Sequence, residues 1–454
     1  MLLTRFPSTS ETHIDFRYAE NDRRKSWLLR YTKNSLFFHY APSGFKKRLL
    51  MKANRRHFLA GLGALAPFSY FRSTATAATE ATQPATPDYF SELHVRPFIN
   101  AVGPYSSLGG AVMWPEVVDA MDYAIRNKAR MSELHDAVGK RIAELMQAEA
   151  AMVTSGATSA IILGTAACMT MGDEEKMERL PDASGMPAEV IILQSQRYLY
   201  DRSIRAPGAT LVEVETAEDI RAAINPRTAM MFYLQNRPEN LRLEAGEYIA
   251  LARESNIPIM CDAATTVPPV ANITNTVSLG FDLICYSGGK GLRGPYSAGL
   301  LLGRKDLIRY ARQNSSPNHR AYGRSMKVSA EEYLGMLVAV ETSLKFDEQS
   351  EYQRQLDIVS EMGSELSLLP GVTTQSHVPG AEAREPFISV HWDTSQYKIT
   401  VAEMKQALRD GEPTIEIRAL FLSDGRLDLT AAMLSKDEAK IVTAKVKEIL
   451  LMSA

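Results

Sequence analysis

The central part of the chain alternates short apolar segments with amphipathic ones, and this alternation restricts the fold more than any other feature. Helical patterns lie between several of the apolar segments, for example at 217–224 and 245–254. Strands that alternate with helices usually form a mainly parallel sheet with helices on both faces. The sequence therefore predicts an α/β domain with a seven-stranded type of sheet. Its predicted strands are, in chain order, AAMVTS, VIILQ, ATLVEV, AMMFYLQ, IPIMCDA, FDLICYS and AGLLLG.

The predicted sheet belongs to a large domain over 121–328, which follows an N-terminal segment at 85–120. Residues 329–454 are expected to form a connecting helix and a smaller C-terminal α+β domain, with the connecting helix over 329–361. The elements of the smaller domain are predicted at FISVHW, 401–409, PTIEIRALF, RLDLT and 436–450.

The first part of the chain has the layout of an export signal. From Met51 it runs MKANRRHFLAGLGALAPFSYFRSTATAATEA, in which Arg55 and Arg56 precede a short apolar stretch and a segment of small residues. This order predicts a twin-arginine signal at about 51–78, a linker to residue 84 and a periplasmic mature protein. The apolar stretch is too short for an ordinary transmembrane helix, so no stable membrane anchor is expected.

Two alternatives stay open for this region. The segment could be an amphipathic helix, and the protein would be cytoplasmic if the signal is not used. Because the signal lies fifty residues inside the chain, residues 1–50 are either a basic extension or the result of a start placed too early, with Met51 as the true start.

Charge and cysteine content argue against several classes of protein. The net charge is −2 and the isoelectric point about 6.5, so nothing indicates a nucleic-acid partner or an anionic membrane. Cys168, Cys261 and Cys285 lie in apolar segments without metal-ligand spacing, which predicts buried thiols. The eight histidines are scattered without paired spacing, so we expect no metal site.

Three candidate functional features come directly after predicted strands, where open α/β sheets bind ligands. AMVTS leads into Gly156-Ala-Thr-Ser159 and a helix, a turn suited to a phosphate although such turns are common. IPIMCDA places Asp262 at a strand end, either as a turn residue or as a carboxylate that keeps a pyridinium nitrogen protonated. FDLICYS leads into SGGKGLRGP, in which Lys290 is a surface-turn residue or a reactive amine.

Together these three features match the needs of pyridoxal phosphate. The cofactor requires an anchor for its phosphate, a carboxylate for its ring nitrogen and a lysine for its aldehyde. Ser155, Asp262 and Lys290 appear in that order, each at a predicted strand end. We therefore expect a pyridoxal-phosphate site.

Five stretches also resemble a known enzyme family: INAVGPYSSLGG, TSGATSA, CDAATTVPP, YSGGKGLRGP and GRSMKVSAEEYLGMLVAVE. They are similar to the fold-type-I pyridoxal-phosphate enzymes of the selenocysteine synthase (L-seryl-tRNA selenium transferase) group. The likeness is strongest to its shorter, D-glucosaminate-6-phosphate ammonia-lyase-like branch and extends over about 96–450. It implies an aspartate-aminotransferase-like fold with a large and a small domain.

The resemblance implies roles for the cofactor-binding residues. Lys290 would bind the cofactor aldehyde and move the Cα proton, and Asp262 would pair with the pyridine nitrogen. The phosphate would be held by Ser155, Gly156, Ala157 and Ser287.

Two arginines are implied to meet anions. Arg293, three residues after the lysine, suits the cofactor phosphate or the substrate, with a solvated loop arginine as the alternative. Arg418, in GEPTIEIR, would receive the substrate carboxylate, with a salt bridge at a strand edge as the alternative.

The chain departs from the family pattern at two places. Ser195-Gln-Arg-Tyr198 stands where relatives have Ser-His-Arg-Asn, so Gln196 replaces the histidine expected over the cofactor ring. Arg293-Gly-Pro-Tyr296 stands where relatives have Arg-Gly-Pro-Gln, which places Tyr296 at the expected substrate side. Tyr198 or Tyr296 could supply an aromatic face in place of the histidine.

The branch implies α,β-elimination on a small amino acid or amino-sugar acid, with release of ammonia and a 2-oxo acid. Replacement on a seryl-tRNA is the alternative within the group, although no basic patch is evident for RNA. Racemisation, transamination and a non-catalytic binding protein of the same fold also stay open. The family further implies a homodimer or higher even oligomer, and we expect residues 100–110 to form a loop near the pocket.

Overall fold

The computed structural model describes residues 87–235, 243–378, 385–418 and 425–454, together with the backbone of three strands nearer the N-terminus. Those strands, β1 (His13–Phe16), β2 (Trp27–Thr32) and β3 (Ser35–Tyr40), pair in an antiparallel sheet. The chain divides into two units, Met1–Ala85 and Thr86–Ala454. The predicted export signal and linker lie outside the described residues. Within those residues, no helix is both long enough and apolar enough to cross a bilayer.

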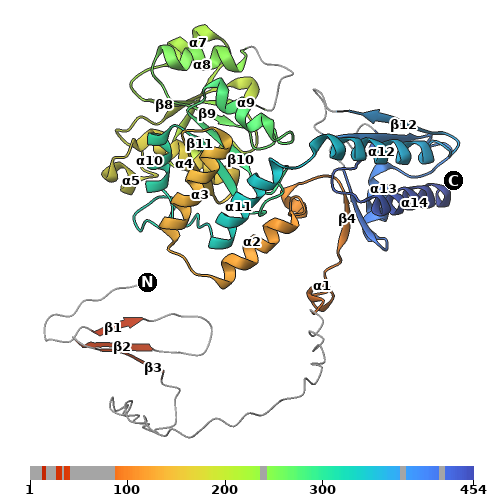
Figure 1. The fold of residues 1–454 in the computed structure, drawn as a ribbon, viewed down its shortest axis with the longest axis horizontal. Helices are drawn as coiled ribbons and strands as arrows, with labels where there is room; N and C mark the ends of the chain where they lie inside the picture. Colours follow the sequence, from red (N-terminus) through yellow and green to blue (C-terminus); the bar gives the residue numbers. More distant parts are fainter. Residues whose placement is uncertain are drawn as a thin grey trace, which may run out of the picture. The chain divides into compact units, whose positions relative to one another are not determined.

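A seven-stranded sheet forms the centre of the large domain (Figure 1). Its order is β5-β11-β10-β9-β8-β6-β7, and β11 is antiparallel to both of its neighbours while the other pairs are parallel. The predicted mainly parallel sheet is therefore confirmed. All seven predicted segments form strands: β5 (Ala150–Thr154), β6 (Glu189–Leu193), β7 (Thr210–Val214), β8 (Thr228–Leu234), β9 (Ile259–Asp262), β10 (Leu283–Ser287) and β11 (Gly299–Gly303).

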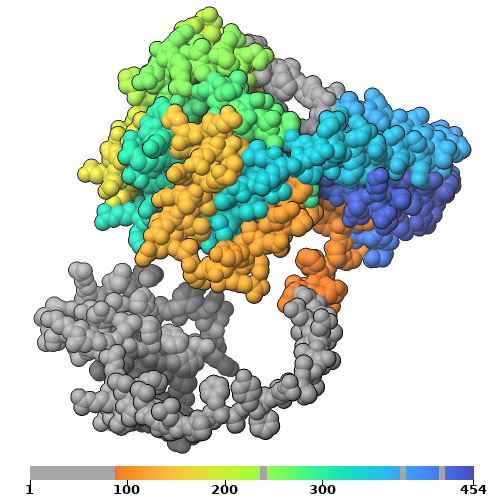
Figure 2. Space-filling model, viewed as in Figure 1, coloured from red at the N-terminus to blue at the C-terminus, as the bar shows by residue number. Residues whose placement is uncertain are grey.

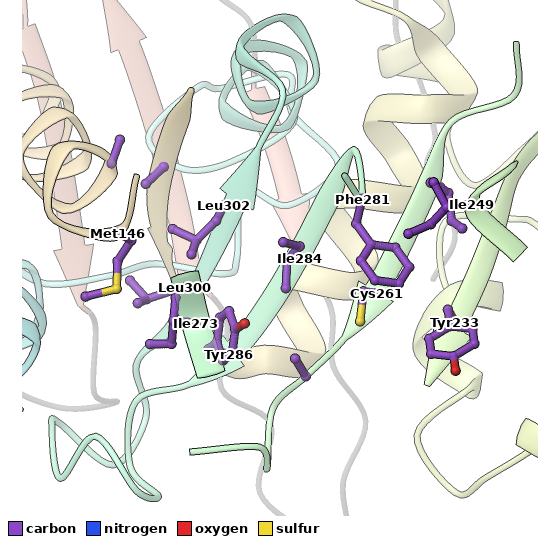
Figure 3. Close-up of a cluster of buried hydrophobic side chains, with 14 of the residues drawn as sticks. Met146, Tyr233, Ile249, Cys261, Ile273, Phe281, Ile284, Tyr286, Leu300 and Leu302 are labelled. Carbon is purple, nitrogen blue, oxygen red and sulfur yellow. The ribbon is translucent and has the colours of Figure 1, made fainter. Parts of the chain in front are cut away.

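Both faces of this sheet are buried, because successive side chains of a strand point to opposite faces. In β8, Met231 and Tyr233 join one apolar cluster, whereas Met230 and Phe232 join a second cluster. Figure 3 shows part of the first cluster around Ile284 and Tyr286. Continuous burial explains the unbroken apolar runs of the inner strands, whereas the edge strand β7 exposes Thr210 and Glu213.

Helices contribute to both clusters. The first cluster includes residues of α3 (Met131–Met146), α8 (Ala245–Glu254), α9 (Ala271–Leu279) and α11 (Ala330–Ser343), and the second includes residues of α4 (Gly156–Thr170) and α10 (Lys305–Gln313). The remaining helical elements of this domain are α5 (Glu174–Arg179), η2 (Gln194–Gln196), α6 (Arg202–Arg205) and α7 (Ala217–Ala223).

The C-terminal residues build a separate antiparallel sheet with its own core. Its order is β12 (Val372–His377), β13 (Phe387–Trp392) and β15 (Leu427–Thr430). A third apolar cluster joins this sheet to α12 (Glu348–Leu366), α13 (Val401–Asp410) and α14 (Lys436–Met452). In Figure 2 these residues, coloured blue, gather in one lobe.

The N-terminal segment connects the small domain to the rest. Its strand β4 (Phe98–Ala101) pairs in parallel with β14 (Thr414–Ile417), after the short helix α1 (Tyr89–Glu92). It then continues through η1 (Ser106–Leu108) into α2 (Pro115–Arg126), which packs against α11. One segment thus contacts both domains.

The prediction of a single connecting helix over 329–361 is wrong. Two helices, α11 and α12, stand in its place, separated by residues 344–347. Ser329 and Glu332 form a capping box at the start of α11, and the Asp347 side chain accepts the Ser350 N–H at the start of α12. The first helix packs on α2 and α3 and the second on β12, β13 and α14, so the break lies where the chain passes from one domain to the other.

Candidate active site

The residues predicted to hold the cofactor ring and phosphate lie at one edge of the large sheet. In the strand register Asp262 lies beside Cys285 of β10 and Leu234 of β8. On the other side, Ser287 pairs with Gly299, which in turn pairs with Thr154 at the end of β5. Because the parallel strands all end at this edge, residues far apart in the sequence form one row, as open α/β sheets require for a ligand site.

The expected phosphate cradle falls on the first turn of α4. Ser155 is the N-cap of this 15-residue helix, and its side chain makes no capping hydrogen bond. The unpaired N–H groups of a helix start and its dipole attract anions. The residues here are small, namely Ser155, Gly156 and Ala157, and all are partly buried. Phosphate binding at this turn fits the geometry and stays a prediction.

Gly299 brings β11 against this turn. A Cβ on Gly299 would lie 2.5 Å from the Gly156 carbonyl carbon and 2.7 Å from the Ala157 nitrogen. Real Cβ atoms do not approach backbone so closely, so only glycine fits here. The row Ser287, Gly299 and Thr154 therefore places Ser287 on the strand next to this contact.

Lys290 stands on a tightly hydrogen-bonded loop after β10. The Gly288 N–H donates to the Ala298 carbonyl at 2.9 Å, and the Gly294 N–H donates to the Gly288 carbonyl at 2.9 Å. A side chain on Gly291 would overlap the Val267 carbonyl oxygen, so the loop lies directly on the segment that follows Asp262. Lys290 itself is partly buried. The glycines therefore fix the loop against its surroundings instead of leaving it a free surface turn.

Arg293 holds the N-terminal segment against this loop. Its guanidinium lies over the Trp114 ring, 3.8 Å from the ring centroid, and its Nε donates to the Val112 carbonyl at 2.8 Å. The Arg293 backbone has φ = 51°, a left-handed conformation that costs energy for a residue with a side chain. Burial lowers the pKa of Arg293. These contacts give Arg293 a clamping role, and its predicted contact with a second anion stays a prediction.

The predicted pocket loop at 100–110 does lie against the lysine loop. The Ala111 N–H donates to the Gly289 carbonyl at 2.8 Å, and the Tyr296 hydroxyl donates to the Ser106 carbonyl at 2.9 Å. Tyr296 remains 52% exposed. The tyrosine thus borders the loop with its ring accessible to a ligand.

Asp262 is buried and already accepts several hydrogen bonds. Its Oδ1 accepts the Ala264 N–H at 2.9 Å and lies 3.4 Å from the Cys285 Sγ, while its Oδ2 accepts the Tyr198 hydroxyl at 2.6 Å. Burial first, and the Asp262 charge second, raise the pKa of the Cys285 thiol well above its usual value. Cys168, Cys261 and Cys285 are all buried and free, as predicted.

Gln196 lies at the same edge, but its side chain bonds to the backbone of β8. Its Nε2 donates to the Leu234 carbonyl at 3.2 Å, and its Oε1 accepts the Leu234 N–H at 2.9 Å. The residue is completely buried. Both ends of its amide are thus occupied in joining β6 to β8, and the predicted place of Gln196 over the cofactor ring remains untested.

Sequence reasoning considered Tyr198 only as an aromatic face and missed Cys285 as a neighbour of Asp262. The Tyr198 ring does stack on Phe232, with 23° between their planes. Its hydroxyl donates to Asp262, although Tyr198 follows β6 and Asp262 stands at the end of β9. The contact of Cys285 follows from the parallel register of β9 and β10, which the sequence does not specify.

Arg418 lies in the small domain, next to β14. Its backbone pairs with that of Asp428 in an isolated antiparallel β-bridge. Its guanidinium lies 5.5 Å from the centre of the Phe387 ring. Its Nε is buried and makes no hydrogen bond within the described residues. A buried donor without a partner suits a residue that waits for an anion, although the carboxylate contact itself remains a prediction.

Two surface hollows lie away from these residues. The larger, of about 1190 Å³, is lined by residues of α3 and α10, including His135 and Arg312. The smaller, of about 500 Å³, is lined by residues of β7 and α7 with Gln194. Lys290, Asp262 and the start of α4 line neither hollow.

The donor set fits pyridoxal phosphate. An ionised carboxylate offers about four acceptor positions, and Asp262 has three donors around it, which leaves about one for a ring N–H. The start of α4 lacks a capping side chain and suits a phosphate. Lys290 provides the primary amine at the same edge of the sheet.

The chain is similar to two curated enzymes over most of its length. Over 375 residues the chain is 28% identical to a 5'-C-glycyluridine monooxygenase-decarboxylase of a Streptomyces species, covering 80% of this chain and 92% of the relative. It is 27% identical to the D-glucosaminate-6-phosphate ammonia lyase of Salmonella typhimurium, covering 80% and 98%.

Solved structures confirm the predicted fold. A D-glucosaminate-6-phosphate ammonia-lyase structure matches with a TM-score of 0.72 at 25% identity, covering 81% of this chain and 99% of that one. A serine palmitoyltransferase of Sphingomonas wittichii, 13% identical with a TM-score of 0.51, shares the fold. The fold is thus that of the fold-type-I enzymes.

The family comparison accounts for the central part of the chain. The family model described as L-seryl-tRNA selenium transferase matches residues 108–355, more than half of the chain. This range contains the start of α4, Asp262 and the lysine loop. The chain therefore belongs to the L-seryl-tRNA selenium transferase family.

Proposed function

We propose that this enzyme is a pyridoxal-phosphate-dependent lyase that eliminates ammonia from a small amino acid or amino-sugar acid. The observation that carries the proposal is the meeting of Ser155–Ala157, Asp262, Ser287 and Lys290 at one sheet edge. The similarity to an ammonia lyase over 98% of that relative's length supports the reaction type.

The residues divide the work of binding. Lys290 would hold the cofactor through its amine, and the N–H groups at the start of α4, with Ser287, would hold its phosphate. Asp262 would bind the ring N–H. When bound, pyridoxal phosphate withdraws electrons from the Cα of an amino acid and so acidifies the Cα proton.

The same side chains account for proton transfer. The Lys290 amine, once free of the cofactor, is the base that takes the Cα proton. Arg418 would bind the substrate carboxylate through its guanidinium, whose Nε has no hydrogen-bond partner among the described residues. Loss of the Cβ substituent with its electron pair, followed by addition of water, gives ammonia and a 2-oxo acid.

Reduction and mapping test the cofactor part of this proposal. The full chain is incubated with pyridoxal phosphate, reduced with borohydride and digested, and the modified peptide is identified by mass spectrometry. We expect one adduct at Lys290, no adduct at that peptide in Lys290→Ala, and wild-type behaviour in the control Lys305→Ala. A wild-type protein without an adduct at Lys290 would contradict the proposal.

A product assay tests the reaction. Amino acids with hydroxyl, thiol or phosphorylated sugar-acid groups are offered, and ammonia and 2-oxo acid are measured together. Equal amounts of the two products are expected. A cofactor adduct at Lys290 without either product from any substrate would refute the elimination while leaving the cofactor site intact.

A second candidate is oxidative decarboxylation, since the chain is 28% identical to a 5'-C-glycyluridine monooxygenase-decarboxylase. Such a reaction would use the same lysine and carboxylate, but it consumes oxygen and releases carbon dioxide. Oxygen uptake and carbon dioxide release in the same assay favour this candidate, and ammonia without either gas favours the lyase.

We further propose that the protein forms a homo-oligomer. Large apolar side chains are exposed along the N-terminal segment, with Tyr89 at 61%, Leu93 at 70% and Tyr123 at 62%. Exposed apolar patches commonly mark protein interfaces. Light scattering coupled to gel filtration tests this, and a monomer at micromolar concentration would contradict it.

Export through the predicted signal at 51–78 is a separate proposal, supported by Arg55 and Arg56 before the apolar stretch. Fractionation and N-terminal sequencing of the protein from cells test it. Replacement of both arginines by lysine is expected to retain the protein in the cytoplasm.

A further inference from the structure

Tyr198 lies at the carboxyl edge of the sheet with its ring fixed by neighbours. The ring stacks on Phe232 of β8, with 6.3 Å between centroids and 23° between planes. Tyr200 packs against it edge-on at 5.9 Å. Because aromatic contacts on two sides restrict the ring, the direction of its hydroxyl is also restricted.

The hydroxyl is directed at the Asp262 carboxylate, at 2.6 Å from Oδ2. Oδ1 of the same carboxylate accepts the Ala264 N–H at 2.9 Å and faces the Cys285 Sγ at 3.4 Å. Asp262 is only 5% exposed, so these protein donors replace the water that an exposed carboxylate would bind.

Both side-chain donors keep their protons. Burial, followed by the Asp262 charge, raises the pKa of the Tyr198 phenol well above its usual value. The same two causes raise the pKa of the Cys285 thiol. A neutral phenol beside a carboxylate can only donate, and donation favours the ionised form of the acceptor.

We propose that Tyr198 is a positioning residue for the cofactor's ring nitrogen, because its hydroxyl donates to the Asp262 carboxylate and holds it oriented toward a ring N–H. The inference rests on the proposed pyridoxal-phosphate site. A proton shared between a buried carboxylate and a pyridine nitrogen lies on the nitrogen only while the carboxylate anion is stabilised. Without the phenol, the proton would move toward the carboxyl group.

The variant Tyr198→Phe removes this donor and keeps the ring. Tyr200→Phe is the matched control, since Tyr200 packs against Tyr198 and no hydrogen bond from its hydroxyl to Asp262 is found in the described part of the chain. Each protein is loaded with pyridoxal phosphate labelled with ¹⁵N in the ring, and the ¹⁵N resonance is recorded. The cofactor dissociation constant is measured in parallel by absorbance.

We expect the ¹⁵N resonance of Tyr198→Phe to move toward that of an unprotonated pyridine, whereas Tyr200→Phe stays at the wild-type position. The cofactor should bind about tenfold more weakly to Tyr198→Phe, the size expected for loss of a hydrogen bond to a charged group. Cys285→Ala removes a weaker donor from the same carboxylate, so it should shift the resonance in the same direction by less.

Two results distinguish failure of the Tyr198 role from failure of the proposed function. If wild-type protein carries the cofactor on Lys290 and the resonance is the same in all variants, the role of Tyr198 is refuted while the proposed function stands. If wild-type protein takes up no cofactor on Lys290, the proposed function and this inference both fail. Should Tyr198→Phe not fold, the Cys285→Ala resonance decides: an unchanged position overturns the inference.

Discussion

Gly299 lies so close to Gly156 that a Cβ on Gly299 would stand 2.5 Å from the Gly156 carbonyl carbon. The contact joins the start of β11 to the first turn of α4, and Ser287 lies beside Gly299 in the register. The predicted phosphate site therefore depends on a residue that sequence reasoning did not select.

Gly299→Ala should displace the first turn of α4, since the added methyl group would overlap backbone that cannot move aside. We expect a loss of about 2 kcal/mol in the free energy of unfolding, as for overpacked cores. Cofactor affinity should fall in parallel. Gly246→Ala is the control, since no described atom beyond its chain neighbours and its own helix backbone lies within 4 Å of its Cβ position. Urea denaturation measures the free energy of unfolding, and absorbance titration measures the cofactor affinity. Equal values of both quantities for the two variants would rule out this close packing.

Arg293→Lys should loosen the clamp between the lysine loop and Trp114. Lysine keeps the charge but loses the planar guanidinium over the ring and the Nε donor to Val112. A decrease of about 1.5 kcal/mol in unfolding free energy is expected. Arg309→Lys, on an exposed arginine over Tyr310, should cost less than about 0.5 kcal/mol. A change in KM without loss of stability would show instead that Arg293 meets the substrate.

His135 should make stability depend on pH. Burial, with the Arg312 charge second, lowers the pKa of His135 to about 3, and the Tyr333 hydroxyl contacts its Nδ1 at 2.9 Å. The unfolded chain binds a proton near pH 6.5 that the folded chain refuses, so this stability is complete above about pH 6.5 and is lost as the pH falls toward about 3.

Between about pH 7 and about pH 5 this linkage removes about 2 kcal/mol from the free energy of unfolding. In His135→Gln the free energy of unfolding should lose this part of its pH dependence. The variant is expected to be less stable than wild type at neutral pH. His319→Gln, at an exposed position, should keep it. Urea denaturation at both pH values decides, and parallel slopes for wild type and His135→Gln would disprove the assignment.

Arg418→Met should affect substrate binding more than stability. The Arg418 Nε is buried without a hydrogen bond in the described residues, so loss of this nitrogen leaves none of their acceptors unpaired. We expect unfolding free energy within about 0.5 kcal/mol of wild type and a KM at least about tenfold higher for the substrate found in the ammonia assay.

Arg426→Met is the comparison for this experiment. Arg426 pairs with buried Asp428 at 3.0 Å, so the variant leaves a carboxylate without its cation and should lose about 2 kcal/mol or more. If Arg418→Met is destabilised as strongly as Arg426→Met and its KM is unchanged, Arg418 has a structural role only.

The strands of the large sheet could be predicted from the sequence alone because most of them are buried on both faces. Strands buried on both faces need apolar residues at every position, as in β8, where all seven residues are buried. Such runs are visible without any knowledge of their partners. Short or half-exposed strands give no such signal, and both β4 (FINA) and β12 (VTTQSH) were missed.

Local sequence also indicated the candidate site, because Ser155, Asp262 and Lys290 lie at or just after the ends of their strands. Each of the three residue types suits one part of the cofactor. What the individual side chains contact was decided by tertiary structure. Gln196 bonds to Leu234 and Arg293 covers Trp114, and neither partner is near in sequence.

The chain's own residue order therefore determined which segments become strands, which residues stand at their ends and which cofactor those residues suit. Only the tertiary structure decided that Tyr198 donates to Asp262, that Gly299 touches Gly156 and that the connecting helix breaks before Asp347. Burial patterns are local properties of a sequence, whereas register, close approach and hydrogen-bond partners depend on how distant strands and helices pack together.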